Sequence, residues 1–530
     1  MIIVLGSTEP ELERHRRQVA SMLERDGDTD LTIRFAPSSP DGEARASAIR
    51  QADTLICIVG TSNGPELPDG SGYAEAEVAV ARRLGVQVLA YAHDAPAEPA
   101  TERDPLHEYS MARARRFKNL LREHYGVRRF STPEELVAGV AEDLDSVRSD
   151  SRAAGSPVVD QVHRRLQAVP NTAFDAYAIS LHNMDAIYRI EHFAPYREEY
   201  VDPPRCSPGG GSANIAYALA RLGMRTAVAG CTAADADGAA LRASLDEAGV
   251  NTDFLLELDP GSPVRTGRTT ILADSGGRRT IFTEEGANAR FAAEITERGR
   301  RQALLQSAGM SRIVIVTYFR SAAERRLQQD LLDGLPSDTL VAFTPGSLYE
   351  SPGASQLAPV IGRANVMFIS EEALGRLLGE LVPHMDVQVA SVPQRAHALI
   401  GWRYELGARD PFLIVVRRPW RGSEPRDGFR YLYLCWGQKG YEGGTGTDGR
   451  LSSEDADRIV DLTGTGGALA AGVLYGLLRS RPPEDCANLA YVLALSAAMR
   501  YGGRDGALTR AEVRDRWSHW LRADVAPSWL

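Results

Sequence analysis

Short apolar runs alternate with amphipathic segments along most of this chain of 530 residues. In the N-terminal part, runs typical of strands and segments with helical spacing follow one another at residues 2–5, 11–25, 31–35, 54–59, 75–84 and 86–92. Strands that alternate with helices are the pattern of a parallel sheet covered by helices. The sequence therefore predicts an α/β fold, in which residues 1–145 form a flavodoxin-like domain with a parallel sheet.

A polar stretch separates this segment from the remainder of the chain. Residues 149–157 are rich in Ser, Asp, Ala and Gly, which predicts a linker over residues 146–171. The alternation then resumes and continues to the C-terminus, which predicts a doubly wound α/β domain over residues 172–530. Two interruptions at 188–208 and 264–284 contain β-favouring residues without helical spacing, so we expect a small β lid over the main sheet.

Composition and charge exclude several classes of protein. The formal net charge is -10, which disfavours a nucleic-acid-binding surface because phosphate neutralisation needs clustered Lys and Arg. No run of about 18 apolar residues occurs, so the sequence predicts no membrane span. Five scattered cysteines without a Cys-x-x-Cys pair favour a reduced, cytoplasmic protein.

Two glycine-rich turns each open an apolar helix. The first is Gly209-Gly210-Gly211-Ser212-Ala213-Asn214, and the second is Asp461-Leu462-Thr463-Gly464-Thr465-Gly466-Gly467. Glycine lets the backbone approach a ligand closely, and the first turn of a helix has free N–H groups. Taken alone, the first turn is more commonly explained by a tight bend that requires glycine. Both turns in one domain favour a site for a polar, anionic ligand.

These two turns resemble the two signatures of the PfkB (ribokinase-like) carbohydrate and nucleoside kinases, and the resemblance covers nearly all of residues 172–525. It implies a ribokinase-like fold and an enzyme that uses ATP and Mg²⁺ to phosphorylate an alcohol group. It also implies a homodimer in which the two lids pair. The resemblance also implies a sugar or nucleoside acceptor that contacts residues near the first signature, namely Asn183, Asp185, Gly210, Gly211 and Asn214. In the second signature, Gly464, Thr465 and Gly466 would cradle the transferred phosphoryl group.

The last residue of the second signature departs from the family pattern. The family places at this position an Asp that takes the proton from the acceptor hydroxyl, whereas this chain has Gly467. Glycine has no side chain that accepts a proton, and the loss of a general base typically lowers the rate by about 10² to 10⁴. Asp461 remains, but it belongs to the start of the loop.

Two further departures fall on the nucleotide side. Ser370 and Ala373 replace the Asn and Glu of the family's Asn-x-x-Glu motif, which organises water bound to magnesium. Glu371 or Glu372 would supply a metal ligand after a shift in register, but acidic residues in the first turn of a helix are equally explained by the helix dipole. The strand over 412–416 continues as Arg417-Arg418-Pro419-Trp420 instead of a small glycine turn.

The N-terminal segment carries a shorter resemblance. Ser7-Thr8-Glu9 follows the first expected strand, and Gly70 to Glu77 opens a helix. This resembles TIR-like and nucleoside deoxyribosyltransferase-like domains, in which such a Glu acts on an N-glycosidic bond. Glu77 is the residue to which the resemblance assigns that role, with Glu75 as the alternative. The helix dipole also favours a Glu in the first turn without any function.

Three functional hypotheses follow from these patterns. The favoured one is a sugar or nucleoside sensor, in which a PfkB-like domain with weak or absent catalysis is coupled to the N-terminal domain. The second is an active ATP-dependent kinase, and the third is an N-glycosidic hydrolase that acts through Glu77. The sequence leaves open whether the protein is an enzyme.

Overall fold

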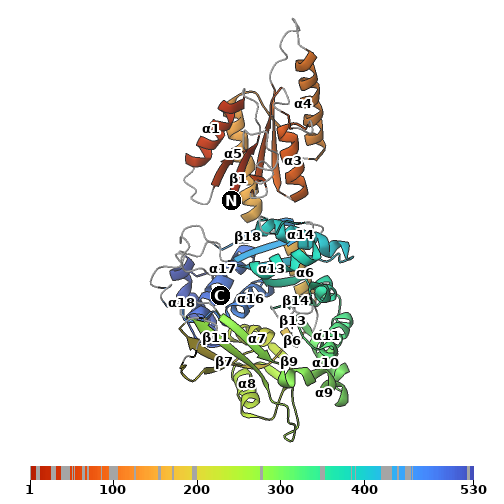
Figure 1. Cartoon of the computed structure of the whole chain (residues 1–530), viewed down its shortest axis with the longest axis vertical. Helices are drawn as coiled ribbons and strands as arrows, with labels where there is room; N and C mark the ends of the chain where they lie inside the picture. Colours follow the sequence, from red (N-terminus) through yellow and green to blue (C-terminus); the bar gives the residue numbers. More distant parts are fainter. Residues whose placement is uncertain are drawn as a thin grey trace. The chain divides into compact units, whose positions relative to one another are not determined.

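The computed structural model describes most of the chain (Figure 1). The residues outside the description are 1, 7–11, 26–31, 37–47, 50–51, 53, 62–65, 68–70, 85, 95–104, 125–126, 153–156, 170–171, 192, 194–197, 199, 275–278, 347–352, 384, 388–389, 419–431, 439–440, 448–454, 456–457 and 522–525. The chain divides into two compact units. The first unit comprises Met1–Ala154 and Val382–Leu399, and the second comprises Gly155–Leu381 and Ile400–Leu530.

The first unit contains a five-stranded parallel sheet in the order β2-β1-β3-β4-β5. This is the flavodoxin-like strand order. The strands are β1 (Ile2–Gly6), β2 (Thr32–Phe35), β3 (Thr54–Val59), β4 (Gln87–His93) and β5 (Val127–Phe130). The helices are α1 (Glu13–Arg25), α3 (Tyr73–Leu84), α4 (Pro105–His124) and α5 (Pro133–Arg152).

Helices cover both faces of this sheet. Leu12, Val19 and Leu136 bring the region of α1 and α5 into one apolar cluster with strand residues such as Ile56. Side chains of α3 and α4 pack in a second cluster against the opposite face (Figure 1). The parallel α/β architecture expected for this part of the chain is confirmed.

The main sheet of the second unit has nine strands in the order β10-β9-β6-β13-β14-β15-β16-β17-β18. It is parallel from β10 to β16, and β17 and β18 continue it as antiparallel strands. The strands are β6 (Phe174–Ile179), β9 (Thr226–Thr232), β10 (Asn251–Glu257), β13 (Ser311–Thr317), β14 (Leu340–Thr344), β15 (Val366–Ser370), β16 (Phe412–Arg417), β17 (Leu432–Gly437) and β18 (Tyr441–Gly446). The predicted doubly wound fold is confirmed.

The core of the second unit is dominated by helices with few polar residues. Helices α16 (Thr465–Leu478) and α17 (Pro483–Ala498) are buried along nearly their whole length, which explains why they show little amphipathic pattern. The other helices are α6 (Pro157–Ala168), α7 (Gly211–Arg221), α8 (Ala236–Glu247), α9 (Phe291–Glu297), α10 (Arg301–Gly309), α11 (Ala322–Gly334), α12 (Ala358–Arg363), α13 (Glu371–Leu381) and α18 (Arg510–Leu521). Helix α14 (Val392–Glu405) belongs to the first unit up to Leu399 and to the second unit from Ile400.

The segment expected as a linker is largely helical. Helix α5 runs to Arg152, and α6 begins at Pro157 and buries Val158, Val162 and Leu166 in the core of the second unit. Burial of apolar side chains on one face holds α6 in place, so this part of the segment is not a free connection. The predicted domain boundaries at residues 145 and 172 stay a prediction.

The lid is a separate four-stranded sheet in the order β12-β11-β7-β8. Its strands are β7 (Asn183–Ile190), β8 (Arg205–Pro208), β11 (Gly267–Asp274) and β12 (Arg279–Glu284), of which β7 and β11 are labelled in Figure 1. Asn183 and Asp185, which the resemblance places at the acceptor, are part of the lid. Strand β6 ends at Ile179, and the two polar residues already belong to β7 because the chain turns directly into the lid.

Candidate functional site

The first glycine turn brings the backbone against the start of the lid. Gly210 has φ +113, and a Cβ atom there would lie 2.2 Å from the carbonyl oxygen of Leu181. Glycine is therefore required at this position. The hydroxyl of Ser180 accepts a hydrogen bond of 2.8 Å from the N–H of Ala213 in the first turn of α7. The turn thus sets the direction in which α7 leaves the sheet.

Asp185 lies directly over this turn. A Cβ atom at Gly209 would lie 2.3 Å from Oδ2 of Asp185, so only glycine lets the backbone pass the carboxyl group. Burial raises the pKa of Asp185 to about 7, and Thr269, Arg504 and Arg279 offset part of this effect. The group therefore changes charge near neutral pH.

Arg504 joins the parts of the acceptor side, and the sequence analysis missed it. Its side chain is buried, and it donates hydrogen bonds to Oδ1 of Asn214 at 2.9 Å, the carbonyl oxygen of Gly209 at 3.0 Å and the hydroxyl of Ser244 at 3.1 Å. Its guanidinium also lies 5.4 Å from the ring centre of Tyr217. A charged residue between glycines, directly after a long apolar helix, was the only signal in the sequence.

A second set of hydrogen bonds ties the start of the lid to the loop that follows it. The amide of Asn288 donates to Oδ1 of Asn183 at 2.8 Å, and Asn183 donates to the hydroxyl of Thr269 at 3.1 Å. Oδ1 of Asn288 accepts from the backbone of His182 at 2.7 Å. Burial lowers the pKa of His182 to about 3, so its ring is neutral at physiological pH. Asn183 thus positions the lid at the edge of the acceptor side.

The second glycine turn is held by Asp461. Its two carboxylate oxygens accept hydrogen bonds from the backbone N–H groups of Thr463 at 2.8 Å and Gly502 at 2.9 Å. Gly464 is left-handed with φ +81, and a Cβ there would lie 2.7 Å from Cα and O of Gly503. Both carboxylate oxygens of Asp461 are therefore committed to holding the loop.

The N–H groups at the start of α16 are available to an anion. Within the described residues, no acceptor lies in hydrogen-bond range of the N–H of Gly464, Gly466 or Gly467. The N–H of Thr465 makes a long bond of 3.4 Å to the carbonyl oxygen of Leu462. Free N–H groups at a helix N-terminus attract negative charge. The geometry suits the phosphate role predicted for this loop, although Thr465 contributes less than expected.

Gly467 faces the first signature across the site. A Cβ atom at Gly467 would lie 3.4 Å from Cβ of Asn214 and 3.9 Å from the backbone nitrogen of Ile215, which are ordinary contacts. The position therefore lies beside Asn214, one of the residues predicted to contact the acceptor, and has room for a Cβ atom. Arg279 of the lid strand β12 also reaches this loop, with 3.4 Å between its guanidinium and the hydroxyl of Thr463.

The carboxylates predicted as metal ligands have protein partners. Glu371 forms an ion pair of 3.0 Å with Arg418, and Glu372 forms one of 2.7 Å with Arg376. The hydroxyl of Ser370 accepts a hydrogen bond of 3.1 Å from the N–H of Ala373 at the start of α13. No group of three or more Asp, Glu, His or Cys side chains suited to a metal ion occurs in the described part of the chain. Residues 419–431 lie outside the described residues.

In the first unit, Glu77 is buried in α3 beneath the end of β1. Its Oε2 would lie 2.4 Å from a Cβ atom at Gly6. Glu75, the alternative, accepts a hydrogen bond of 2.9 Å from the N–H of Gly72 and forms an ion pair of 2.9 Å with Arg113. Residues 7–9 and Gly70, which carried the rest of the resemblance, lie outside the described residues.

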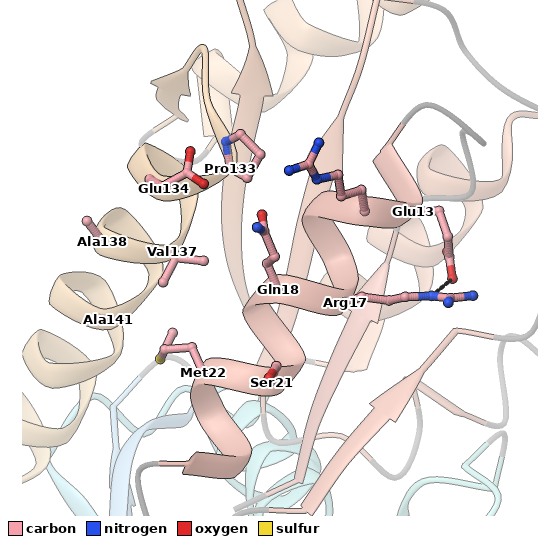
Figure 2. Close-up of a pocket in the computed structure, with 11 residues that line it drawn as sticks. Glu13, Arg17, Gln18, Ser21, Met22, Pro133, Glu134, Val137, Ala138 and Ala141 are labelled. Carbon is pink, nitrogen blue, oxygen red and sulfur yellow. Dashed lines mark hydrogen bonds and ion pairs between the residues drawn. The ribbon is translucent and has the colours of Figure 1, made fainter.

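A groove of about 1040 Å³ lies between α1 and α5 of the same unit. Figure 2 shows Gln18 and Met22 of α1 opposite Pro133 and Val137 of α5. Helices α1 and α5 cover the face of the sheet opposite to α3. The groove is therefore separate from Glu77, and Glu77 does not line it.

In comparisons with known proteins, the two parts of the chain match different families. Residues 175–401 match the pfkB family of carbohydrate kinases, and residues 3–145 match a domain of unknown function, DUF4062. The first match ends before the second glycine turn. An uncharacterized sugar kinase from Archaeoglobus fulgidus is 25% identical over 292 residues, which cover 54% of this chain and 97% of that protein.

Solved structures confirm the ribokinase-like fold. A nucleoside kinase from Burkholderia thailandensis in complex with inosine covers 66% of this chain and 99% of its own, with a TM-score of 0.51 and 16% identity. A ribokinase from Arabidopsis thaliana complexed with ribose and ATP covers 65% of this chain and 99% of its own, with a TM-score of 0.51 and 18% identity. At such identities the likeness shows the fold alone.

The N-terminal comparison does not confirm the TIR-like or deoxyribosyltransferase-like resemblance, and the hydrolase hypothesis has no support. Within the described residues, no helix combines the length and the apolar character needed to cross a membrane. Residues 175–401 are thus similar to the pfkB family of carbohydrate kinases, and residues 3–145 are similar to the domain of unknown function DUF4062.

Proposed function

We propose that the second unit binds a sugar or nucleoside next to an anion-binding loop and transfers phosphate weakly or not at all, so that the protein acts as a ligand sensor. Occupancy of the site is then passed to the DUF4062 domain. One observation carries this proposal. The buried side chains expected to bind the acceptor are present, whereas the position expected to hold the general base is Gly467. A cytoplasmic location and a homodimer belong to the same proposal.

The acceptor side supports ligand binding. Asp185 and Asn214 are buried side chains held by Gly209, Thr269 and Arg504. Buried polar groups that are fixed by neighbours bind a polyhydroxylated ligand without a large loss of side-chain entropy. The match to the pfkB family covers Asp185, Gly209, Asn214 and Thr269, whereas Arg504 lies outside it.

The phosphate side supports anion binding without proton transfer. The N–H groups of Gly464, Gly466 and Gly467 and the guanidinium of Arg279 would hold the terminal phosphates of ATP, which would supply the phosphoryl group. A general base must lie within hydrogen-bond reach of the acceptor hydroxyl. Gly467 has no such group, and the carboxylate of Asp461 is engaged by two backbone N–H groups.

An active kinase is the second candidate, and one observation favours it. Asp185 is a carboxyl group on the acceptor side whose pKa is raised to about 7 by burial, and a general base is most effective when its pKa is near the working pH. In this case Asp185, rather than residue 467, would take the proton. Substitution of Asp185 by Asn would then abolish the transfer.

The test is Gly467→Asp in the full chain, assayed for phosphoryl transfer from ATP to a panel of sugars and nucleosides. We expect the substitution to raise the transfer rate by about 10² to 10⁴, since it restores a carboxylate base at a position where a Cβ atom makes only ordinary contacts. Gly466→Asp is the matched control, because it adds the same charge one residue away, where a Cβ atom would meet no neighbour within 4 Å.

The outcomes separate the two candidates. If the unmodified protein already transfers phosphate to some acceptor at about 1 to 100 s⁻¹, the rate of an ordinary kinase, the sensor proposal is refuted. An equal gain in the Gly466→Asp control would show that added charge, and not a base at residue 467, changed the rate.

A further inference from the structure

Three arginines lie on one face of the lid sheet. The strand register aligns Asp185 with Ser207 and Thr269, and two residues further along it aligns Ile187 with Arg205. The next aligned row contains Arg189, Ala273 and Arg279. Paired residues and residues two apart on a strand share a face of the sheet. Arg189, Arg205 and Arg279 are therefore on the same face as Asp185.

Two of these arginines converge on a single aromatic ring. The guanidinium of Arg205 lies 4.1 Å from the ring centre of Tyr501, and that of Arg189 lies 5.5 Å from it. Neither arginine forms an ion pair with a carboxylate among the described residues. Both side chains are exposed, so their N–H donors are accessible to a ligand.

Tyr501 places these guanidinium groups beside the rest of the site. The next residue, Gly502, donates its N–H to Asp461 and abuts Ser207, since a Cβ there would lie 2.2 Å from the Ser207 hydroxyl oxygen. Ser207 is the register partner of Asp185. Along the sheet, Arg205 is two residues from Asp185, or about 7 Å. An acceptor held by Asp185 is therefore within reach of Arg205.

The guanidinium groups of Arg189 and Arg205 lie close together, because both contact the ring of Tyr501. Guanidinium groups that approach each other repel, and a shared anion removes that repulsion. Arginine is suited to phosphate and carboxylate because its planar fork donates two parallel hydrogen bonds. An acceptor with only hydroxyl groups would leave Arg189 and Arg205 without an anionic partner.

We propose that the acceptor carries an anionic group, a phosphate or a carboxylate, that Arg189 and Arg205 bind on the lid. This inference rests on the proposed function, because it names the class of sugar or nucleoside that enters the site. Arg279 is on the same face of the lid, but it contacts Thr463 of the loop proposed to bind phosphate. Arg189 and Arg205 thus select the acceptor, while Asp185 binds its hydroxyl groups.

The test is calorimetric titration of the full chain with matched compounds. Ribose, fructose and inosine are compared with ribose 5-phosphate, fructose 6-phosphate and inosine 5′-monophosphate, and gluconate supplies the carboxylate arm. We expect a charged compound to bind at least tenfold more tightly than its neutral counterpart. Arg189→Ala and Arg205→Ala should each remove about a factor of ten of that preference, as a charge-assisted hydrogen bond does, with little change for the neutral compound.

Arg268→Ala is the matched control. Arg268 is an exposed arginine of the same sheet, but its register places it one residue from Thr269 and so on the opposite face, near Asp237. Its substitution should leave the preference unchanged. Arg205→Lys keeps the charge and should restore part of the preference, which a merely structural role for the stacked arginine would not predict.

The outcomes separate this inference from the proposed function. If neutral and charged compounds bind equally, the inference is wrong and the proposed function stands. If no compound of either kind binds, the proposed function fails. If Arg189→Ala and Arg205→Ala weaken the binding of ADP and not that of the charged acceptors, the arginines serve the nucleotide, and the inference is again wrong.

Discussion

The acceptor side and the phosphate side of the second unit differ in what holds them together. On the acceptor side, charged and amide side chains from distant segments meet, as Arg504, Asn214 and Asp185 do. At the second glycine turn, the backbone N–H groups of Gly464, Gly466 and Gly467 have no acceptor among the described residues, residue 467 is a glycine, and Glu371 is paired with Arg418. Anion binding needs only a glycine turn and a helix N-terminus, whereas proton transfer needs one particular side chain. Under the proposed function, anion binding is therefore retained where proton transfer is lost.

The largest effect that tests this comparison is expected for Arg504→Ala. The substitution leaves Asn214, Gly209 and Ser244 without their donor, and each buried unsatisfied group costs roughly 1 kcal/mol or more. We expect the free energy of unfolding of the second unit to fall by about 3 kcal/mol, with loss of acceptor binding. Urea unfolding followed by tryptophan fluorescence reports on this unit alone, since all 6 tryptophans follow residue 400.

Arg500→Ala is the control for that prediction, because Arg500 is an exposed arginine of the same segment. It should change the free energy of unfolding by less than about 0.5 kcal/mol. If Arg504→Ala were as mild as this control, the acceptor side would not depend on side chains that meet from distant segments. The contrast with the phosphate side would then fail.

A second, smaller effect concerns pH. The pKa of Asp185 is raised to about 7 by burial, above its ordinary value of 3.8. The stability that this group contributes is therefore complete below pH 3.8 and is lost as the pH rises through about 7. Between pH 5 and pH 7 we expect the free energy of unfolding to fall by about 2 kcal/mol because of this group. Asp185→Asn should remove that part of the pH dependence, as measured by urea unfolding at both pH values.

A pH dependence that is the same in the Asp185→Asn variant would show that other groups cause it. Glu324, whose pKa burial also raises to about 7, is the internal comparison, because it lies in α11 and accepts hydrogen bonds from the N–H of Ala292. Glu324→Gln should change the pH dependence of unfolding without changing acceptor binding. Asp185→Asn should change both.

The smallest effect is expected at Glu371. Its ion pair with Arg418 is partly exposed, and such pairs contribute about 0 to 1 kcal/mol. If the carboxylate serves Arg418 and not a metal, Glu371→Gln lowers the free energy of unfolding by less than about 1 kcal/mol and leaves the Mg²⁺ dependence of nucleotide binding unchanged. Glu372→Gln is the control on the neighbouring residue. If Glu371→Gln but not Glu372→Gln removed the Mg²⁺ dependence, Glu371 would be a metal ligand and the prediction would be wrong.

Much of the fold could be predicted from local pattern. The strand runs, the helices after both glycine turns and the presence of a lid follow from hydrophobic spacing and from glycine positions, which act within a few residues. The boundary between β6 and the lid was missed, because apolar and polar residues continue through the short turn at 180–182 without a glycine or proline to mark it. The roles of Arg504 and Arg279 were also missed, since a single arginine has no local signature.

The sequence by itself determined the two α/β units, the two glycine turns and the absence of a side chain at residue 467. These features depend on backbone conformation and on the identity of one residue, so no distant contact is needed to infer them. Only the tertiary structure decided which side chains complete the site. Arg504 meets Asn214 across 290 residues of chain, and the lid arginines share the face of Asp185 through strand register. These contacts join residues that are far apart in sequence, so they depend on strand register and on how the sheets and helices pack.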